Sequence, residues 1–356
     1  MNLKNINKKT KDNLITLGII VVAYIIVMIL KGTGSLSSLF TGLLVPLCAY
    51  SILAVSLNLT VGILGELSLG HAGFMCVGAF SSAFFSKLTE DVITVDIIRF
   101  ILALLVGAIC AAIAGLLIGL PVLRLRGDYL AIVTLAFGEI IKNIINVLYI
   151  GKDSNGLHFS IKDSLSLGLE PDGNIIINGA QGITGTPKDS TFTIGIILLI
   201  ITLLIVLNLM DSRTGRAIMS IRDNTIAAES VGINITKYKL MAFTISASLA
   251  GVGGVLYAHN LNSLMAQPKN FGYNMSIMIL VYVVLGGIGN MRGSVIAAVI
   301  LTMLPELLRG LSDYRMLIYS IVLIAMMLYN WSPAAINWRK TNLSNGKLFK
   351  KSKEVS

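Results

Sequence analysis

A short glycine-rich run contains the side chains of this sequence that could handle a solute. Between Gly62 and Phe80 it places a carboxylate at Glu66, a hydroxyl at Ser68 and an imidazole at His71 among several glycines. Glycine lets backbones approach closely, and polar groups at membrane depth are costly unless they face protein or water. Such a run is typical of a translocation path or of a tight interhelical contact, and the residues alone leave both open. A lone histidine such as His71 is either a packed hydrogen-bonding residue or a proton relay.

A second polar group, Glu139, lies near the middle of an apolar segment at 129–149. An acid at the centre of a membrane helix costs roughly 2.5–3.5 kcal/mol, while each Leu, Ile, Phe or Val returns about 0.3–0.6 kcal/mol. The segment contains enough of these residues to insert. Glu139 either lines the path or pairs with Lys142 one turn away.

These residues need membrane helices to position them. The chain has 356 residues, of which 55% are hydrophobic and 13% charged, with a mean hydropathy of +0.81. A soluble domain has about 25% charged residues. Apolar runs long enough to cross a bilayer recur along the chain. They predict an all-α integral membrane bundle of about ten helices, at 14–30, 38–59, 68–86, 98–120, 129–149, 192–210, 240–258, 274–289, 293–309 and 314–331. Eight crossings with re-entrant segments near 60–80 are the alternative.

The basic residues orient this bundle. Lysines precede the first span, and a Lys- and Arg-rich stretch follows the last one. Because cytoplasmic loops are enriched in Lys and Arg, both termini are expected inside. This predicts a basic N-terminus at 1–13, a membrane domain at 14–331 and a basic tail at 332–356. The loop at 150–191 is then outside and the loop at 211–239 is inside.

Several functions are excluded or disfavoured by composition. The net charge of +10 comes from basic residues scattered over membrane-proximal loops, so nucleic-acid binding is not expected. Three cysteines without a CxxC pair favour neither a disulfide framework nor a metal site. The sequence has no GxxxxGK[ST] motif, so ATP is not bound through a P-loop here. No cofactor is expected on this chain, and an ATPase that drives it would be a separate protein.

The inner loop at 211–239 has helical character, with Ile218, Ile221, Ile226 and Val231 forming a partial apolar face before a stop at Gly232. A short amphipathic helix of this kind docks into a groove of another protein or lies flat on the lipid surface.

Small residues recur every four positions in two spans and predict close helix packing. At the outer boundary, His259 and Asn260 are expected to be interfacial. The two stripes are Gly107, Ala111, Gly115 and Gly119, and Ala242, Ser246, Ala250, Gly254 and Ala258.

Five ordered motifs resemble the permease subunits of branched-chain amino acid ABC importers, and the LivM-type subunit in particular. The resemblance covers roughly residues 40–330. The first motif runs from Ser56-Leu-Asn58 through Ser68-Leu-Gly-His71. The other four are Leu123-Arg-Leu-Arg-Gly-Asp-Tyr129 to Glu139, Ser212-Arg-Thr-Gly-Arg216, Arg222-Asp-Asn-Thr-Ile-Ala227-Ala228 to Gly232, and Val284-Leu-Gly-Gly-Ile-Gly289.

The resemblance implies a bacterial-type, multi-pass cell-membrane protein that works with a homologous second permease, two cytoplasmic ATPases that bind ATP, and an extracytoplasmic binding protein. The inner loop resembles the "EAA…G" coupling segment, although Ile226 stands where that pattern begins with Glu. The implied coupling residues are Arg216, Arg222, Asp223, Ala227, Ala228 and Gly232.

The expected function is an importer permease for leucine, isoleucine and valine, with no enzyme activity of its own. Similar permeases for urea, short amides or other amino acids are an alternative, and an ion-coupled secondary transporter is a third reading. A membrane-embedded enzyme would need clustered catalytic groups, which are not evident. The residues expected to line the substrate path are Asn58, Ser68, His71, Thr134 and Glu139.

Overall fold

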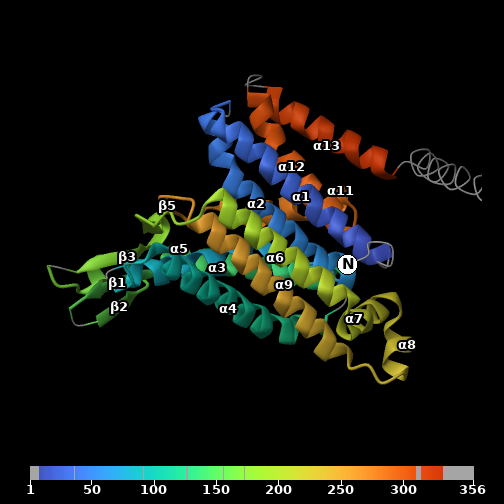
Figure 1. The fold of residues 1–356 in the computed structure, drawn as a ribbon. Helices are drawn as coiled ribbons and strands as arrows, with labels where there is room; N and C mark the ends of the chain where they lie inside the picture. The colour runs from blue at the N-terminus through green and yellow to red at the C-terminus, as the bar shows by residue number, and fades with distance from the viewer. Residues whose placement is uncertain are drawn as a thin grey trace, which may run out of the picture. The chain divides into compact units, whose positions relative to one another are not determined.

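The computed structural model describes residues 8–35, 37–90, 92–125, 127–154, 156–171, 173–309 and 314–331, and most of these lie in helices (Figure 1). The chain divides into two compact units, Met1–Val299 and Ile300–Ser356. The first unit contains the glycine-rich run and both predicted loops. Arg126, the first part of the predicted basic N-terminus and the whole predicted tail at 332–356 lie outside the described residues.

Each of the ten predicted spans coincides with a helix. These are α1 (Lys8–Gly32), α2 (Ser38–Asn58), α3 (His71–Leu88), α4 (Asp96–Val122), α5 (Asp128–Val147), α6 (Phe192–Asp211), α9 (Ile235–Ala258), α11 (Tyr273–Gly286), α12 (Met291–Leu307) and α13 (Arg315–Trp331). Among the described residues, six stretches are long and apolar enough to cross a bilayer: Ile15–Gly32, Ser38–Leu64, Asp96–Val122, Asp128–Val147, Phe192–Asp211 and Ile235–Ala258. The structure therefore confirms a membrane bundle of helices, while the number of crossings stays a prediction.

Helix α9 is the centre of the first unit, and α2, α3 and α4 pack against it (Figure 1). The predicted small-residue stripes of α4 and α9 are buried. A Cβ added to Gly115 would lie 2.5 Å from the Cβ of Ala247, so these two backbones approach as closely as their small residues allow. The stripes therefore do what the sequence predicts and bring the helices into direct contact.

The polar segment at 150–191 is folded, which the sequence did not predict. Strands β1 (Tyr149–Asp153), β2 (Gly156–Ser160) and β3 (Asn174–Asn178) form an antiparallel sheet in the order β2-β1-β3. Ile150, Ile176 and Ile177 are buried with the bundle core. A short helix η3 (Leu165–Leu167) follows β2, and η4 (Gly179–Gln181) precedes β4 (Ile183–Thr184), which pairs with β5 (Ser263–Leu264). Gly179, Gly182 and Gly185 have positive φ, which lets the chain turn between these short elements.

The inner loop forms two helices rather than one, so the prediction of a single amphipathic helix is wrong. Helix α7 (Arg213–Asp223) ends at Asn224, whose side chain accepts a hydrogen bond from the Ala227 N–H and begins α8 (Thr225–Ser230). This N-cap changes the direction of the chain. Ile218 and Ile221 are consequently buried, whereas Ile226 and Val231 are 81% and 75% exposed.

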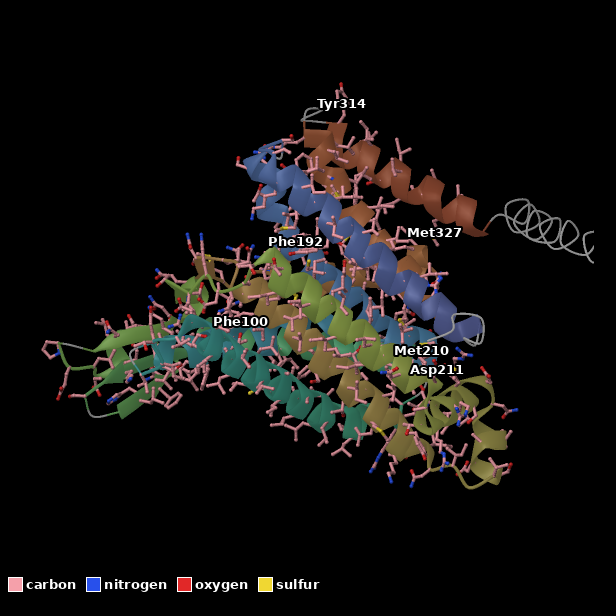
Figure 2. All side chains as sticks on the ribbon, in the orientation of Figure 1. Phe100, Phe192, Met210, Asp211, Tyr314 and Met327 are labelled. Atoms are coloured by element: carbon pink, nitrogen blue, oxygen red, sulfur yellow. The ribbon has the colours of Figure 1, made fainter. Side chains whose placement is uncertain are left out.

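Figure 2 shows the two ends of the first unit. Phe100 and Phe192 lie at the end that bears the sheet, and Met210 and Asp211 lie at the opposite end, beside α7. The residues between them form the apolar length of α4 and α6. The polar residues predicted to contact a solute lie between the end that bears the sheet and the end that bears α7 and α8.

Candidate translocation and coupling site

The glycine-rich run interrupts the helices between α2 and α3. Helix α2 continues as a π-helix, η2 (Leu59–Leu64), and the chain then leaves helical structure until His71. Gly65 ends η2 with φ of +79°, a conformation that favours glycine. We call residues 65–70 the break. Non-helical backbone at membrane depth is tolerated where protein or a water-filled cavity covers it.

Asn58 fastens the helix before the break to the connection between α11 and α12. Its Oδ1 accepts from the Gly289 N–H at 2.8 Å, and its Nδ2 donates to Ser294 Oγ at 2.8 Å. Gly62 lies against Gly289, and a Cβ on Gly62 would collide with that backbone. Asn58 is fully buried. Both of its polar atoms are satisfied within the chain, so in this conformation it holds helices together.

Thr134 of α5 covers the other side of the break. Its hydroxyl accepts from the Leu69 N–H at 3.1 Å, and its carbonyl lies where a Cβ on Gly70 would have to be. Ser68 is fully buried, and its hydroxyl has no hydrogen-bond partner among the described residues. A buried polar atom without a partner is costly. A role of Ser68 in the path stays a prediction.

His71 begins α3 and is buried. Its Nε2 lies 2.8 Å from Ser56 Oγ, and its ring meets Phe74 edge to face. Its Nδ1 is buried without a hydrogen-bond partner among the described residues. The next residue donates its backbone N–H to Ser276 Oγ of α11 at 3.1 Å. This geometry is that of a packed, hydrogen-bonding histidine, one of the two alternatives for His71. A role of His71 in the path stays a prediction.

Glu139 is held by two partners. Its carboxylate forms an ion pair with Lys142 and accepts from the Tyr273 N–H at 2.7 Å. Tyr273 begins α11, just after the short helix α10 (Pro268–Phe271). The contact with Lys142 that the sequence offered as one alternative is present. Asn58, Ser68, His71 and Thr134 surround the break, whereas Glu139 fastens α5 to the start of α11.

Helix α7 contacts the break directly. Arg222 donates from Nη1 to the Gly62 carbonyl at 2.8 Å, and a Cβ on Gly65 would lie 2.5 Å from its Cγ. Lys239, in the first turns of α9, forms an ion pair with Glu66 of the break. The inner loop is thus joined to the glycine-rich run by one hydrogen bond and one ion pair. Spacing along the sequence gave no sign of either contact.

The other predicted coupling residues lie around this junction. Arg216 donates to the Asp211 carbonyl at 2.9 Å, and Asp223 pairs with Arg222 at 2.8 Å. Ala227 is exposed and Ala228 is buried. Gly232 has φ of +84°, and a Cβ there would meet no atom within 4 Å. Glycine is therefore favoured at position 232 by the left-handed backbone conformation, and not by a lack of space for a side chain.

A polar cavity of about 670 Å³ opens beside these residues. The break contributes Glu66, α8 and its neighbours contribute Ile226 and Glu229, α9 contributes Lys239, and the connection between α4 and α5 contributes Arg124. The junction of inner loop and break therefore lies beside a polar cavity that is large enough to hold water.

A charged cluster at the other end was missed by sequence reasoning. His259, expected to be interfacial, is fully buried, with Nδ1 3.7 Å from Asp189 and Nε2 3.5 Å from Ser86 Oγ. Arg99 is buried in α4 and lies 3.4 Å from Asp189. Burial lowers the pKa of His259 to about 4, with Arg99 adding to the effect. Burial also raises the pKa of Asp189, against the opposing effect of Arg99.

Comparison with known proteins places the chain in a family. Residues 39–329 match the family model described as branched-chain amino acid transport system, permease component. The LivM permease protein of the high-affinity branched-chain amino acid transport system of Salmonella typhimurium is 35% identical over 297 residues, 81% of this chain and 67% of the relative. That of Escherichia coli is 33% identical over 338 residues, 92% and 75%.

More distant relatives are named for other solutes. The nucleoside ABC transporter permease protein NupC of Lactococcus lactis is 25% identical over 199 residues, 56% of this chain and 60% of the relative. No solved structure matches. The match over residues 39–329 includes the break, the inner loop and the connection between α11 and α12. The chain belongs to the family of permease components of branched-chain amino acid transport systems.

Proposed function

We propose that this chain is the membrane subunit of an ATP-driven importer for leucine, isoleucine and valine. The observation that supports it most is the 33% identity over 92% of the chain to a permease named for branched-chain amino acids. Permeases named for nucleosides are less similar and cover less of the chain. Urea, a short amide or another amino acid is the alternative solute.

The proposed topology has ten crossings with both termini in the cytoplasm. It gives α7 and α8 to the cytoplasmic side and the sheet to the outer side. The excess of Lys and Arg in the segments assigned to the cytoplasm supports this orientation. The domain boundaries at 14–331, with basic segments at 1–13 and 332–356, belong to the same proposal.

The proposed partners are a homologous second permease, two cytoplasmic ATPases that bind ATP, and an extracytoplasmic binding protein. Exposed Ile226 and Val231 support ATPase docking, because a large apolar side chain on α8 and another just after it are available for a partner groove. This chain binds neither ATP nor another cofactor in the proposal, and its role is transport.

Coupling would pass through Arg222. A displacement of α7 by the ATPases acts on the Gly62 carbonyl through the 2.8 Å hydrogen bond and on Gly65 through direct packing. Arg216, Asp223, Ala227, Ala228 and Gly232 would shape the docking surface around it. When the break moves, the unpaired polar atoms of Ser68 and His71 become available to a zwitterionic solute. Asn58, Thr134 and Glu139 would then control how far the helices separate.

The test compares Arg222→Ala with Arg213→Ala in complexes purified with the co-expressed partner subunits. Arg213 is an exposed arginine of the same helix. Leucine uptake is measured in proteoliposomes with ATP inside and binding protein outside, together with ATP hydrolysis. We expect Arg222→Ala to lose uptake while hydrolysis continues, because the ATPases still dock but their motion no longer reaches the break. Arg213→Ala should transport like the wild type.

Three results would change the proposal. Uptake that needs no ATP would favour an ion-coupled secondary transporter. ATP-dependent uptake of a different solute, without leucine transport, would keep the coupling and replace the substrate. Equal uptake by the two variants would remove Arg222 from the coupling route.

A further inference from the structure

One face of strand β2 is apolar and uncovered. Leu157 and Phe159 alternate along β2, and Ile161 follows it in the same period, with exposures of 42%, 64% and 74%. In the register of the sheet, Phe159 lies opposite Ile150 and Leu157 opposite Lys152. Residues directly opposite one another in an antiparallel pair share a face. Ile150 is buried with the bundle core, so this face starts in the core and emerges uncovered at the edge strand.

The other face of the hairpin is occupied. Gly151 packs against Leu169, and the His158 ring lies 3.0 Å from the Asp153 carboxylate. Ser160 and Ser166 hydrogen-bond to each other through their side chains. The hairpin is therefore amphipathic, with its polar groups turned toward the segment that follows it. The apolar face of β2 is left without a partner from the described residues of the chain.

The position of β2 along the chain brings it close to the bilayer. Helix α5 is long enough to cross a membrane and ends at Val147, and β1 begins two residues later. Phe159 lies opposite Ile150, three residues past the helix end, which is at most about 10 Å along a strand. The headgroup region on each side of the hydrocarbon core is about 5–8 Å thick. The distance of Phe159 from the end of α5 is therefore comparable to the thickness of the interface.

The surroundings of this face match a lipid surface. Ile97, Ile98 and Ile101 at the same end of α4 are all more than half exposed, as expected for lipid-facing residues. Lys152 and Lys162 flank the apolar side chains of the hairpin. A surface of Phe, Leu and Ile bordered by lysines is typical of elements that lie in the interface, with the ammonium groups reaching the headgroups. Figure 1 shows the sheet extending beyond the ends of α4 and α5.

We infer that the face formed by Leu157, Phe159 and Ile161 docks into the headgroup and upper acyl region of the lipid bilayer. This anchors the sheet to the membrane beside α4 and α5. The inference depends neither on the transported solute nor on which side of the membrane the sheet lies. It concerns the lipid as the occupant, because the face is apolar, is bordered by lysines and follows directly on the membrane-spanning helix α5.

The experiment uses tryptophan fluorescence of the full chain. Trp331→Phe and Trp338→Phe give a background without tryptophan, into which Phe159→Trp is introduced. The control is Thr184→Trp, an exposed residue of β4 in the other sheet. Each protein is reconstituted in phosphatidylcholine vesicles, with and without bromine on the upper acyl chain. Ile161→Trp is a second reporter in case Phe159→Trp disturbs folding.

We expect the tryptophan at 159 to emit at shorter wavelength than the control and to lose about half of its intensity in brominated vesicles, as a ring at the headgroup and acyl boundary would. The Thr184→Trp control should keep its intensity. Water-like emission that brominated lipid does not quench, at both 159 and 161, would overturn the inference. Blue-shifted emission that appears only when partner subunits are added would also overturn it, and would assign the face to a protein.

Discussion

The two ends of the first unit are both fastened by charged side chains, but they differ in their access to water. At the end with α7, Glu66 pairs with Lys239 beside the 670 Å³ cavity, and Arg222 is partly exposed. At the end with the sheet, the side chains of Arg99 and Asp189 are 7% and 10% exposed and His259 is buried against Phe100. The side chains of Lys239 and Glu66 are also only 12% and 13% exposed, so the two ion pairs differ in the cavity beside them and hardly in their own exposure. We call the pair that lines the cavity the wet junction and the cluster of Arg99, Asp189 and His259 the dry cluster.

Separating charges is cheap in water and expensive in a dry interior. The wet junction can therefore open and close repeatedly at small cost, whereas the dry cluster keeps α4, α9 and the 185–191 segment together. We expect conformational change during transport to be concentrated at the end near the cavity. The predictions below test this asymmetry.

Removing Asp189 should have the largest effect. Asp189→Ala leaves the Arg99 guanidinium buried with only the exposed Asp96 as a carboxylate partner, 2.7 Å away. An unpaired buried charge costs about 3–5 kcal/mol, and we expect about 3 kcal/mol because Asp96 remains. The measurement is thermal or denaturant unfolding of the full chain in detergent. Asp96→Ala is the control and should cost under about 1 kcal/mol. Equal losses would contradict a dry cluster.

Acid should weaken the same end. The pKa of His259 falls to about 4 in the folded protein because burial disfavours the imidazolium. The unfolded chain, with a histidine pKa near 6.5, binds protons first. The stability that comes from burying His259 in its neutral form is fully present above pH 6.5 and is lost as the pH falls toward 4. Between pH 7 and pH 5 we expect a loss of about 2 kcal/mol.

His259→Gln isolates this effect, because it leaves Asp189 in place. The raised pKa of Asp189 gives an opposite slope, since protonation of that buried carboxyl is favoured by folding. Melting temperatures of the two proteins should converge as the pH falls from 7 to 5. Parallel curves over this interval would show that His259 is protonated without cost and is reached by water.

The smallest effect is expected at the wet junction. Lys239→Gln removes the partner of Glu66 but leaves the carboxylate beside a cavity that admits water, so stability should fall by under about 1 kcal/mol. Unfolding measured beside Asp189→Ala tests the asymmetry directly. A loss as large as that of Asp189→Ala would mean that both ends are dry and that the cavity does not hydrate Glu66.

Much of the bundle follows from local pattern. Hydropathy predicts the helices because each is a continuous apolar run, and the stripes through Gly115 and Ala247 predict the contact of α4 with α9. The inner loop was only partly predictable. The spacing of its apolar residues predicts a single helix, but Asn224 caps a second helix in the middle of that stretch. The sheet was missed because hydropathy treats Ile176 and Ile177 as part of a polar loop, although they are buried.

The site was less predictable than the bundle. Arg99, Asp189 and His259 are far apart in the sequence. A hydropathy scale treats charged residues near the end of a span as exposed, so it predicts each of these side chains at a surface. Arg222 was chosen from its motif, and its role in coupling stays a prediction; its contact with Gly62 spans 160 positions and depends on how α7 packs against η2. The roles of Asn58, Ser68, His71, Thr134 and Glu139 in transport remain predictions for the same reason.

The length of the continuous helix formed by α2 and η2 implies that coupling depends on the thickness of the bilayer. It has 27 residues, about 40 Å at 1.5 Å per residue, against a hydrocarbon core of about 30 Å. A thicker or thinner membrane therefore changes how far its π-helical end protrudes, at a modest cost for each ångström of mismatch. Arg222 donates a hydrogen bond to that end, at the Gly62 carbonyl. We expect the ratio of solute imported to ATP consumed to vary with the acyl-chain length of the surrounding lipid.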